Sequence, residues 1–493
     1  MSSRRIKQPW FTQDLEVTMM ATLTMGLKPW FMAAAPAGLD KYLWPGRPNR
    51  DLTVLSSCCG VPVTESAYEA CREAFSHIAE ASSPRRAGHY FERLREGIVQ
   101  GIRDGLSVPL DAPIILTQSV PEAFRLAASL LWLEADCKPM TAILPASGES
   151  VSSIPLAVQG RIRDGGPGHD GAGILEGVDL VQVGLRQSDG RLRHDVQLLE
   201  SFHLEAERAA SQPIVYGSLG DGTGTVAPLS CPPQARLVLD AAQMRLRPER
   251  VGAHLRRGWP VVISGSGFLG APGTTGALVL PPGRFGDLLV ERVVAIGGFD
   301  FREGWDPESG PLPYSGCVLR WLPALDNLRG MNALGKKAEV RIAQMTFEIA
   351  SFLEDYPDIA VLPGRTEHHV AICGRDSGIV TFAVRAPVKP QGWSTMAELI
   401  ALYQDLAEAG VLLGHPVMAG GRAALRIAVS AEDVLHGGIG PSLARLGDAL
   451  TRTTAVRPLL RRPPGPKPGV RPGLGGSGVR GATCRRSGPQ LYC

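Results

Sequence analysis

Seven short apolar runs, each bounded by turn residues, punctuate the chain and constrain its fold more than any other feature. The apolar residues within a run are consecutive rather than alternating, which is the pattern of strands buried on both faces of a sheet. Segments long enough for crossover helices separate the first five runs, whereas a tight Gly-rich stretch separates the last two. We therefore predict an α/β fold whose large domain holds a seven-stranded, mostly parallel sheet with one antiparallel strand. The runs span residues 113–118, 142–146, 179–185, 213–219, 236–242, 260–265 and 276–281.

Helices are expected before this sheet, at residues 64–80 and 86–104, where apolar residues recur at three- and four-residue spacing. After about residue 310 the pattern changes to long helices, at 326–355 and 394–410, mixed with a few strands. We assign those strands to the segments IAVLPG, HHVAICG, IVTFAVR and ALRIAVS. This mixture predicts a smaller C-terminal α+β domain.

The chain accordingly divides into an N-terminal segment (1–60), a large domain (61–310), a small α+β domain (311–455) and a tail (456–493). From Arg457 onward the tail has seven arginines, one lysine and no acid, so it carries +8. It is rich in Pro and Gly and too poor in apolar residues to fold, so we expect a disordered basic appendage, although such tails also bind nucleic acid or anionic membranes. Since the whole chain carries +3, the remainder carries −5, and we expect no nucleic acid as partner of the folded part.

Composition places the chain among globular proteins, because its 493 residues are 44% hydrophobic and 20% charged. No apolar run approaches the roughly 18 residues that span a bilayer, so no membrane partner is expected. The first twenty residues make a poor secretory signal, because acidic residues interrupt any hydrophobic region. Nine scattered cysteines, odd in number and without CxxC spacing, favour a reducing cytoplasm.

Two pairs of adjacent residues raise the question of a metal or redox site. Cys58 and Cys59 are compatible with such a pair, but adjacent cysteines without nearby partners are more often small packing residues. His368 and His369 begin the expected strand HHVAICG, where alternation sends their rings to opposite faces. Because that is poor geometry for one ion, we predict no metal site. His415, in the GHPV stretch, is expected in a turn before ALRIAVS.

The segment from Arg236 to Pro281 carries a more specific signal. An acidic residue ends one apolar run, a Ser-rich turn ends the next, and a Gly-rich stretch leads into the third. This layout resembles the cofactor-binding half of pyridoxal-phosphate (PLP) enzymes of fold type I, in the class-V aminotransferase and cysteine desulfurase-like branch. The resemblance covers about residues 35–435.

The resemblance implies catalytic roles for two residues. Asp240 would face the pyridine nitrogen and keep it protonated, so that the ring can act as an electron sink. Gln243 would donate a hydrogen bond to the phenolic oxygen of the ring. The alternative for Asp240 is a strand-end aspartate that caps the following loop.

The resemblance also locates a missing residue. In ISGSGF, Gly267 stands where family members carry the Schiff-base lysine. Glycine can neither hold PLP as an imine nor act as the general base at Cα. Lys41 is the one other lysine considered as a replacement, and a sequence variant at position 267 is a further alternative.

Further cofactor contacts are implied at the ends of other runs. Thr117, Gln118 and Ser119 precede a helix, where free N–H groups and the helix dipole suit a phosphate. A plain helix N-cap at Ser119 is the alternative. Glu149, followed by the Gly160–Arg161 pair, matches a motif of a related branch of the family. Ser264 and Ser266 flank Gly267 and would bind the phosphate or the ring.

Two residues are implied to act at the edges of the site. Thr275 resembles the residue that reaches the phosphate of the neighbouring subunit in class-V dimers. Arg426, in ALRIAVS, resembles the arginine that grips the substrate carboxylate, a role that suits a bidentate guanidinium. A surface or ion-pair arginine is the alternative.

Two classes of function follow from this resemblance. In the first, the chain is a PLP-type enzyme or a lysine-less derivative that acts on an amino acid or related amine and holds PLP or pyridoxamine phosphate non-covalently. In the second, it is a catalytically inactive pseudoenzyme that serves as scaffold or partner subunit. A homodimer is expected in either case, because class-V sites are completed across a two-fold axis. A lysine restored at position 267 is expected to convert reversible binding into covalent attachment.

Overall fold

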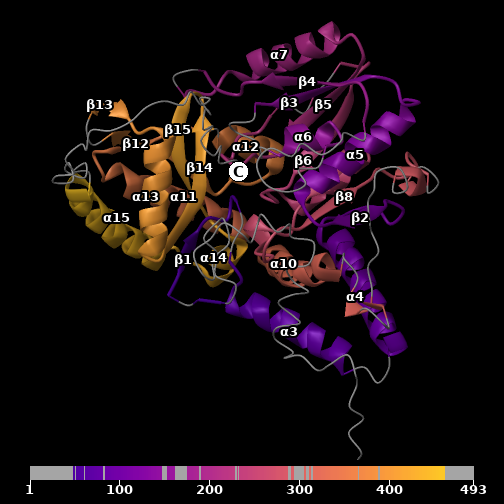
Figure 1. Ribbon diagram of the computed structural model, residues 1–493, viewed down its shortest axis with the longest axis horizontal. Helices are drawn as coiled ribbons and strands as arrows, with labels where there is room; N and C mark the ends of the chain where they lie inside the picture. Colours follow the sequence, from indigo (N-terminus) through magenta and orange to yellow (C-terminus); the bar gives the residue numbers. More distant parts are fainter. Residues whose placement is uncertain are drawn as a thin grey trace, which may run out of the picture.

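The computed structural model contains two large sheets with helices packed around them, and one small two-stranded sheet (Figure 1). It describes residues 48–460 with several gaps, and it leaves out residues 1–47 and 461–493. Lys41 and most of the basic tail therefore lie outside the described residues. The gaps are residues 50, 60–61, 81–83, 147–152, 162–174, 188–189, 228–229, 231, 287–289, 294–304, 307–309, 312–314, 365 and 387–388.

The larger sheet has seven strands in the order β2-β8-β7-β6-β5-β3-β4. Strand β8 runs antiparallel to both of its neighbours, and the other pairs are parallel. The predicted seven-stranded, mostly parallel sheet with one antiparallel strand is thus confirmed. Its strands are β2 (Ile114–Thr117), β3 (Met140–Pro145), β4 (Val178–Val183), β5 (Gln212–Ser218), β6 (Arg236–Ala241), β7 (Val261–Ile263) and β8 (Gly276–Val279).

Continuous apolar runs form these strands because both faces of the sheet are covered. In β6, the side chains of Leu237 and Leu239 belong to one buried cluster, whereas Val238 between them belongs to another. Successive side chains of a strand point to opposite faces, so a strand buried on both sides must be apolar at consecutive positions. Helices α5 (Val120–Glu134) and α6 (Ile154–Val158) cover the Val238 face, and α7 (Asp195–Arg208) and α8 (Pro248–Leu255) cover the other.

The second sheet has six strands and lies beside the first (Figure 1). Strand β1 (Thr53–Leu55), near the start of the described chain, pairs in parallel with β14 (Val411–Ala419), more than 350 residues later. The order continues through β15 (Arg422–Ala428), β12 (Ile379–Ala386) and β11 (Ile359–Val361), with β13 (Lys389–Trp393) pairing to β12. Around it lie α11 (Lys336–Glu354), α12 (Thr366–Cys373), α13 (Met396–Glu408), α14 (Ala431–His436) and α15 (Gly440–Leu460).

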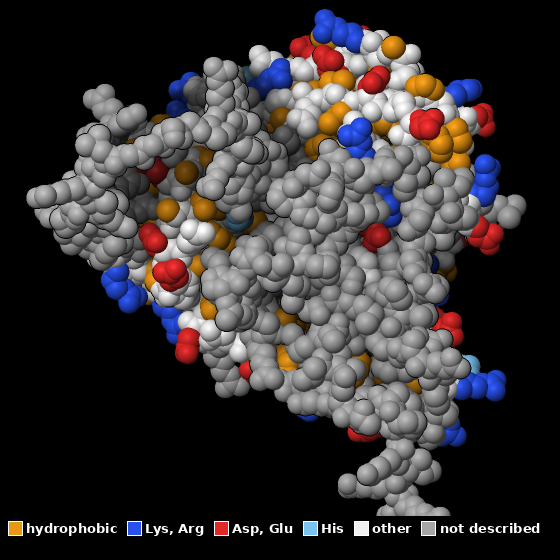
Figure 2. Space-filling view, viewed as in Figure 1, with side chains coloured by type: hydrophobic (Ala, Val, Ile, Leu, Met, Phe, Trp, Pro, Cys, Tyr) orange, Lys and Arg blue, Asp and Glu red, His pale blue; other side chains and the backbone are white. Residues whose placement is uncertain are grey.

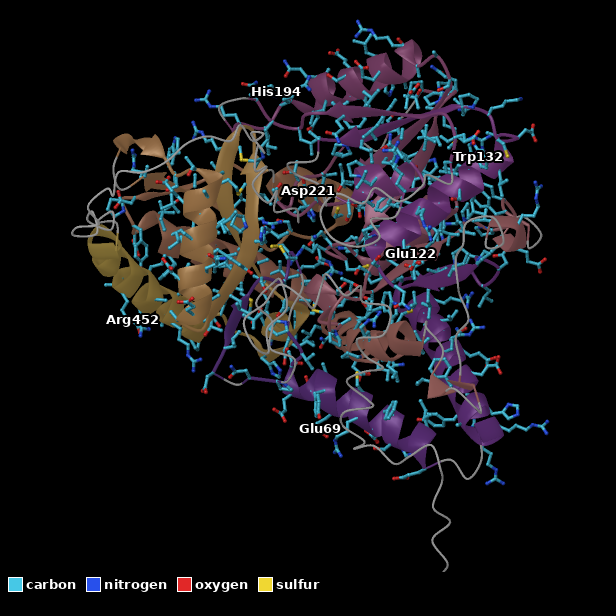
Figure 3. The ribbon with its side chains drawn as sticks, in the orientation of Figure 1. Glu69, Glu122, Trp132, His194, Asp221 and Arg452 are labelled. Atoms are coloured by element: carbon cyan, nitrogen blue, oxygen red, sulfur yellow. The ribbon has the colours of Figure 1, made fainter. Side chains whose placement is uncertain are left out.

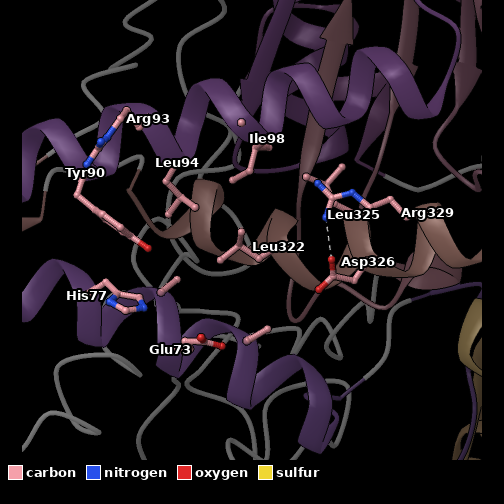
Figure 4. Close-up of a pocket in the computed structure, with 13 residues that line it drawn as sticks. Glu73, His77, Tyr90, Arg93, Leu94, Ile98, Leu322, Leu325, Asp326 and Arg329 are labelled. Atoms are coloured by element: carbon pink, nitrogen blue, oxygen red, sulfur yellow. Dashed lines mark hydrogen bonds and ion pairs between the residues drawn. The ribbon is translucent and has the colours of Figure 1, made fainter.

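Three long helices pack together at the lower edge of the molecule in Figure 1: α3 (Glu65–Ala79), α4 (Pro84–Gly105) and α10 (Ser315–Leu334). A Cβ added at Gly105 would lie 2.5 Å from a methyl group of Leu328, so the missing side chain permits close approach of α4 to α10. A groove of about 400 Å³ between the three helices is lined by His77, Tyr90 and an Arg329–Asp326 ion pair, among others (Figure 4). Short elements complete the fold: β9 (Trp305–Asp306), β10 (Gly310–Pro311) and the 3₁₀ turn η1 (Gly267–Leu269).

Three local expectations were wrong. The helix expected at 326–355 is two helices, α10 and α11, which are separated at Gly335, a glycine with φ +53°. The segment HHVAICG forms helix α12 and not a strand, so the alternation argument for the two histidines does not apply. His415 lies within strand β14 and not in a turn. The pairing of β14 with β15 shifts register between Gly414 and Val417, and such a bulge accommodates a proline inside a strand.

The surface carries both signs of charge. Acidic and basic side chains are interspersed along the upper rim in Figure 2, where α7 lies. Among the helices of the described residues, none combines the length and apolar character needed to span a membrane.

Candidate functional site

The carboxyl ends of the central strands bring most of the predicted residues to one edge of the large sheet. Ser218 at the end of β5 pairs in register with Asp240 of β6, and Asp240 pairs with Val262 of β7. Thr117 at the end of β2 pairs with Gly276 at the start of β8. In open α/β sheets ligands bind beyond this edge.

Asp240 has a nearly isolated carboxylate. Its Oδ1 accepts a hydrogen bond from the Ala242 N–H at 2.9 Å. Burial raises the pKa of this carboxyl to about 7, against the lowering effect of the Ala242 N–H, and the charge of Asp221 raises it further. A cationic partner at this position would restore the ordinary acidity of the group.

Asp221 is a site residue that the sequence analysis did not identify. It lies in the loop after β5, between the two sheets (Figure 3). Its Oδ1 accepts bonds from the Thr223 N–H and hydroxyl, both at 2.7 Å, and from the Thr225 N–H at 2.9 Å. Burial nevertheless raises its pKa, so two carboxyls whose pKa is raised by burial lie near each other.

Polar atoms without a protein partner gather at this edge. Within the described part of the chain, Ser218 Oγ, Asp221 Oδ2, Gln243 Oε1 and Thr275 Oγ1 are buried and make no hydrogen bond. Buried polar atoms in folded proteins are almost always satisfied, by protein, water or ligand. The atoms of Ser218, Asp221 and Gln243 lie at and just after the ends of β5 and β6, so they indicate a position for a polar ligand or ordered water, whereas Thr275 Oγ1 lies near Trp321 and Ala324 of α10.

Gln243 connects the large sheet to the start of the chain. Its Nε2 donates to the Cys58 carbonyl oxygen at 2.9 Å, which leaves Oε1 as the unpartnered atom. The next residue in the chain, Cys59, accepts a hydrogen bond at its Sγ from Arg426 at 2.9 Å. The segment after β1 thus lines the crevice between the two sheets, a placement that only the long-range β1–β14 pairing makes possible.

The predicted serine and threonine ligands are engaged with one another. The Ser264 hydroxyl donates to the Thr275 carbonyl oxygen at 2.6 Å and lies 2.7 Å from the Ser266 hydroxyl. The Thr275 N–H donates to Ser266 Oγ at 3.2 Å. Thr275 is fully buried within its own chain, so its side chain does not face solvent. These residues form a closed turn that fixes the segment between β7 and β8.

The loop after β2 is also satisfied internally. Ser119 is the N-cap of α5 and accepts from the Glu122 N–H at 3.4 Å. The Glu122 carboxylate, labelled in Figure 3, accepts from the Gln118 N–H at 2.7 Å, so an anion of the chain itself occupies the helix start. The Gln118 side chain accepts from Arg320 at 2.6 Å, and the Thr117 hydroxyl donates to the Ser119 carbonyl oxygen at 3.0 Å.

Arg320 was not predicted as a site residue, since α10 shows no sequence signal beyond its apolar pattern. Its guanidinium is almost fully buried and also donates to the Thr274 carbonyl oxygen at 2.9 Å. Burial lowers its pKa to about 10. Arg320 therefore ties the loop after β2 to the turn before β8.

Gly267 adopts a conformation that other residues avoid. Its φ is +70°, in the left-handed region that favours glycine. A Cβ at this position would lie 2.7 Å from the Ser57 carbonyl oxygen. Any side chain at position 267 thus requires the chain near Ser57 to move.

Arg426 lies in the crevice, although its donors are already engaged. It donates to the His415 carbonyl oxygen at 2.6 Å, to the Gly222 carbonyl oxygen at 2.9 Å, and to the Cys59 thiol. Only 4% of the residue is exposed. Glu149 falls outside the described residues, whereas Gly160 and Arg161 follow α6, at the Val238 face of the sheet.

Comparison of the sequence with protein-family models gave no match, and comparison with curated proteins gave none either. Comparison with solved structures did. A NifS-like protein from Rickettsia africae ESF-5 is 13% identical with a TM-score of 0.52, over 82% of this chain and 100% of that one. The cysteine desulfurase CsdA from Escherichia coli is 16% identical with a TM-score of 0.52, over 82% and 95%. A cysteine desulfurase from Thermococcus onnurineus NA1 is 14% identical, also at 0.52 over 82% and 95%. The chain therefore has the mixed α/β fold seen in fold-type I PLP enzymes.

Proposed function

We propose that this chain is a lysine-less derivative of a fold-type I PLP enzyme that binds a pyridine-ring vitamer non-covalently. The observation that carries the proposal is the set of unsatisfied polar atoms at the strand edge, next to an Asp240 carboxylate whose pKa is raised to about 7. A protonated ring nitrogen would satisfy Asp240. Gln243 was expected to donate to the phenolic oxygen of the ring, but its Nε2 already donates to the Cys58 carbonyl oxygen, so its Oε1 would instead accept from an amine on the ligand.

The residues fit the two ends of PLP unequally. At the ring end, Asp240 and Gln243 are present with free acceptor capacity. At the phosphate end, Ser119 and Gln118 are already bonded, and Glu122 places a negative charge where a phosphate would lie. We therefore expect the ring to supply most of the affinity and the phosphate little.

When bound, PLP supplies an electron sink for reactions at an amine carbon. In this chain Asp240 would hold a proton at the ring nitrogen, and Arg426 would orient a carboxylate only after giving up its present acceptors. Lys138, Lys336 and Lys337, the lysines whose side chains are described, lie away from the strand edge: the first precedes β3 and the others begin α11. No lysine among them would attach the cofactor covalently.

A catalytically inactive scaffold is the second candidate. The internally bonded loops at Gln118 and Ser264 favour it, because they stabilise the fold without any ligand. In either case we propose a homodimer that takes an amino acid or related amine as ligand, and light scattering measures the dimer directly.

Thermal unfolding in the presence of pyridoxamine and pyridoxamine phosphate tests the proposal. Ligand at a hundredfold excess over its dissociation constant should stabilise the chain by about 2.7 kcal/mol. Asp240→Ala should abolish the shift, whereas Asp326→Asn, in the exposed pair with Arg329, should leave it intact. Borohydride treatment with PLP should leave no lysine specifically modified. If neither vitamer raises the unfolding temperature of the wild-type chain, the proposal is wrong and the inactive scaffold is the function that remains.

A further inference from the structure

We propose that Cys58 and Cys59 form a redox-reactive thiol pair in the crevice, with Cys59 as the nucleophile and Cys58 as the resolving thiol. The inference does not depend on vitamer binding. It concerns two cysteines to which the proposed vitamer site gives no role.

The pair is placed by three parts of the chain. The two sulfur atoms are 3.9 Å apart, and Arg426 Nη2 donates to Cys59 Sγ at 2.9 Å. The Cys58 carbonyl is held by Gln243. A Cβ on Gly414 would lie 2.5 Å from Cys58 Sγ, so the absence of a side chain at Gly414 makes room for that thiol. Strands β14 and β15 and the loop after β6 therefore hold the two thiols side by side.

The difference in solvent exposure between the two thiols indicates which of them reacts first. Cys58 is 5% exposed and packs against Ile379 and Ala428, whereas Cys59 is only partly buried. An electrophile from solvent therefore meets Cys59 first. Cys58 lies behind it, within reach of the same sulfur.

Charge supports the same assignment. The Cys58 thiol, as hydrogen-bond partner, lowers the pKa of Cys59 to about 6, and the guanidinium of Arg426 lowers it further, against the effect of burial. The pKa of Cys58 is raised, first by that hydrogen bond and then by burial, although Arg426 and Arg245 oppose the change. The pair thus holds one thiolate and one thiol near neutral pH, the arrangement that nucleophilic attack and resolution require.

The reaction balances with a hydroperoxide as oxidant. The Cys59 thiolate attacks the distal oxygen, the O–O bond breaks, and a sulfenic acid and an alkoxide or hydroxide form. The Cys58 sulfur then attacks the Cys59 sulfur, a disulfide forms, and the hydroxyl leaves as water with the Cys58 proton. Adjacent Cα atoms are about 3.8 Å apart, closer than disulfides usually bridge, so the bond is strained and readily reduced by a dithiol. Oxidation also removes the thiolate that Arg426 now contacts.

Alkylation with iodoacetamide, followed by peptide mass spectrometry, tests the nucleophile. Cys137 is the internal control, since it is exposed and lies far along the chain, after α5. At pH 6.5 Cys59 should react about five-fold faster than Cys137 despite its lower exposure. Arg426→Gln should slow Cys59 and move its rate profile to higher pH, whereas Arg426→Lys should preserve much of the rate. If wild-type Cys59 reacts no faster than Cys137, the proposal is wrong.

Hydrogen peroxide tests the resolving step. The wild-type peptide that contains both cysteines should lose two hydrogens and regain them with dithiothreitol. In Cys58→Ser, oxidised Cys59 should persist as a sulfenic acid that dimedone traps, and in Cys59→Ser neither product should form. A dimedone adduct on wild-type Cys59 without any disulfide would overturn the role of Cys58.

Discussion

The Ser57 carbonyl oxygen lies 2.7 Å from the point where a Cβ on Gly267 would stand. Together with a φ of +70°, this contact means that glycine at position 267 is built into the backbone. A lysine restored there would have to displace Ser57, whose hydroxyl donates to the carbonyl oxygens of Ala428 and Val429 at 2.9 and 2.7 Å. Gly267→Lys should therefore not restore covalent attachment by itself, in contrast to what the resemblance alone implies.

A pair of glycine substitutions measures this effect. Gly258 has φ +81° but no atom within 4 Å of an added Cβ, so Gly258→Ala should cost only the left-handed backbone, about 1–2 kcal/mol. Gly267→Ala should cost more, roughly 3 kcal/mol, because the Ser57 contact is added. Urea unfolding of both variants gives the difference. Equal losses in the free energy of unfolding would mean that the backbone at Ser57 moves without energetic cost.

Asp240 should make stability depend on pH. Its folded pKa of about 7 is above the ordinary value of 3.8, so the folded state binds the proton more tightly than the unfolded state. This contribution is complete below about pH 4 and is lost as pH rises through 7, at up to roughly 1.4 kcal/mol per pH unit. Asp240→Asn should flatten that part of the profile. Asp221, also with a raised pKa, contributes in the same direction, so the difference between wild type and variant is the quantity to measure.

Glu122 should discriminate against phosphorylated ligands. Its carboxylate accepts from the Gln118 N–H at the start of α5, where a phosphate would otherwise bind. In Glu122→Gln, the affinity for pyridoxamine phosphate should rise about five-fold relative to pyridoxamine, since one negative charge is removed. Isothermal titration of both ligands gives the ratio. Glu69→Gln, in an exposed pair with Arg72, should leave the ratio unchanged.

Arg245 should be needed for the association of the two sheets. It is buried and donates to the carbonyl oxygens of Ser377 and Val429 and to the Ser57 hydroxyl, each at 2.8 Å. Lysine lacks the planar fork that reaches all three, so Arg245→Lys should destabilise the fold by roughly 3 kcal/mol. Arg329→Lys, in an exposed pair, should change stability by less than about 0.5 kcal/mol. Similar denaturant midpoints for both variants would contradict this role.

The sequence predicted the large sheet because burial on both faces produces consecutive apolar residues. It predicted that Asp240, Ser264 and Thr117 lie at one edge of the sheet because parallel strands end together, and the strand pairing has them at that edge, whereas their roles there stay a prediction. HHVAICG was misassigned because a short apolar run is compatible with either a strand or a helix. His415 was misassigned because Gly and Pro usually mark a turn, whereas here they lie at a bulge.

The placement of Cys59 and Arg320 could not be predicted in this way. Both reach the site through contacts between segments far apart in the chain, and no local pattern encodes those contacts. Asp221 differs, because it follows β5 directly and its hydrogen bonds are to Thr223 and Thr225 nearby in the chain. The two cysteines alone suggested packing residues. Their chemistry appears only when Arg426 lies 2.9 Å from one of them.

The pairing of β1 with β14 has a consequence for biosynthesis. Residues 53–59 leave the ribosome early, yet the strand and carbonyls that hold them, at positions 411–429, are made more than 350 residues later. The large sheet is encoded entirely between those two segments, so it has the opportunity to fold while the crevice is still open on one side. A nascent chain released before residue 429 would thus present a folded sheet with an unformed pocket and two uncovered thiols.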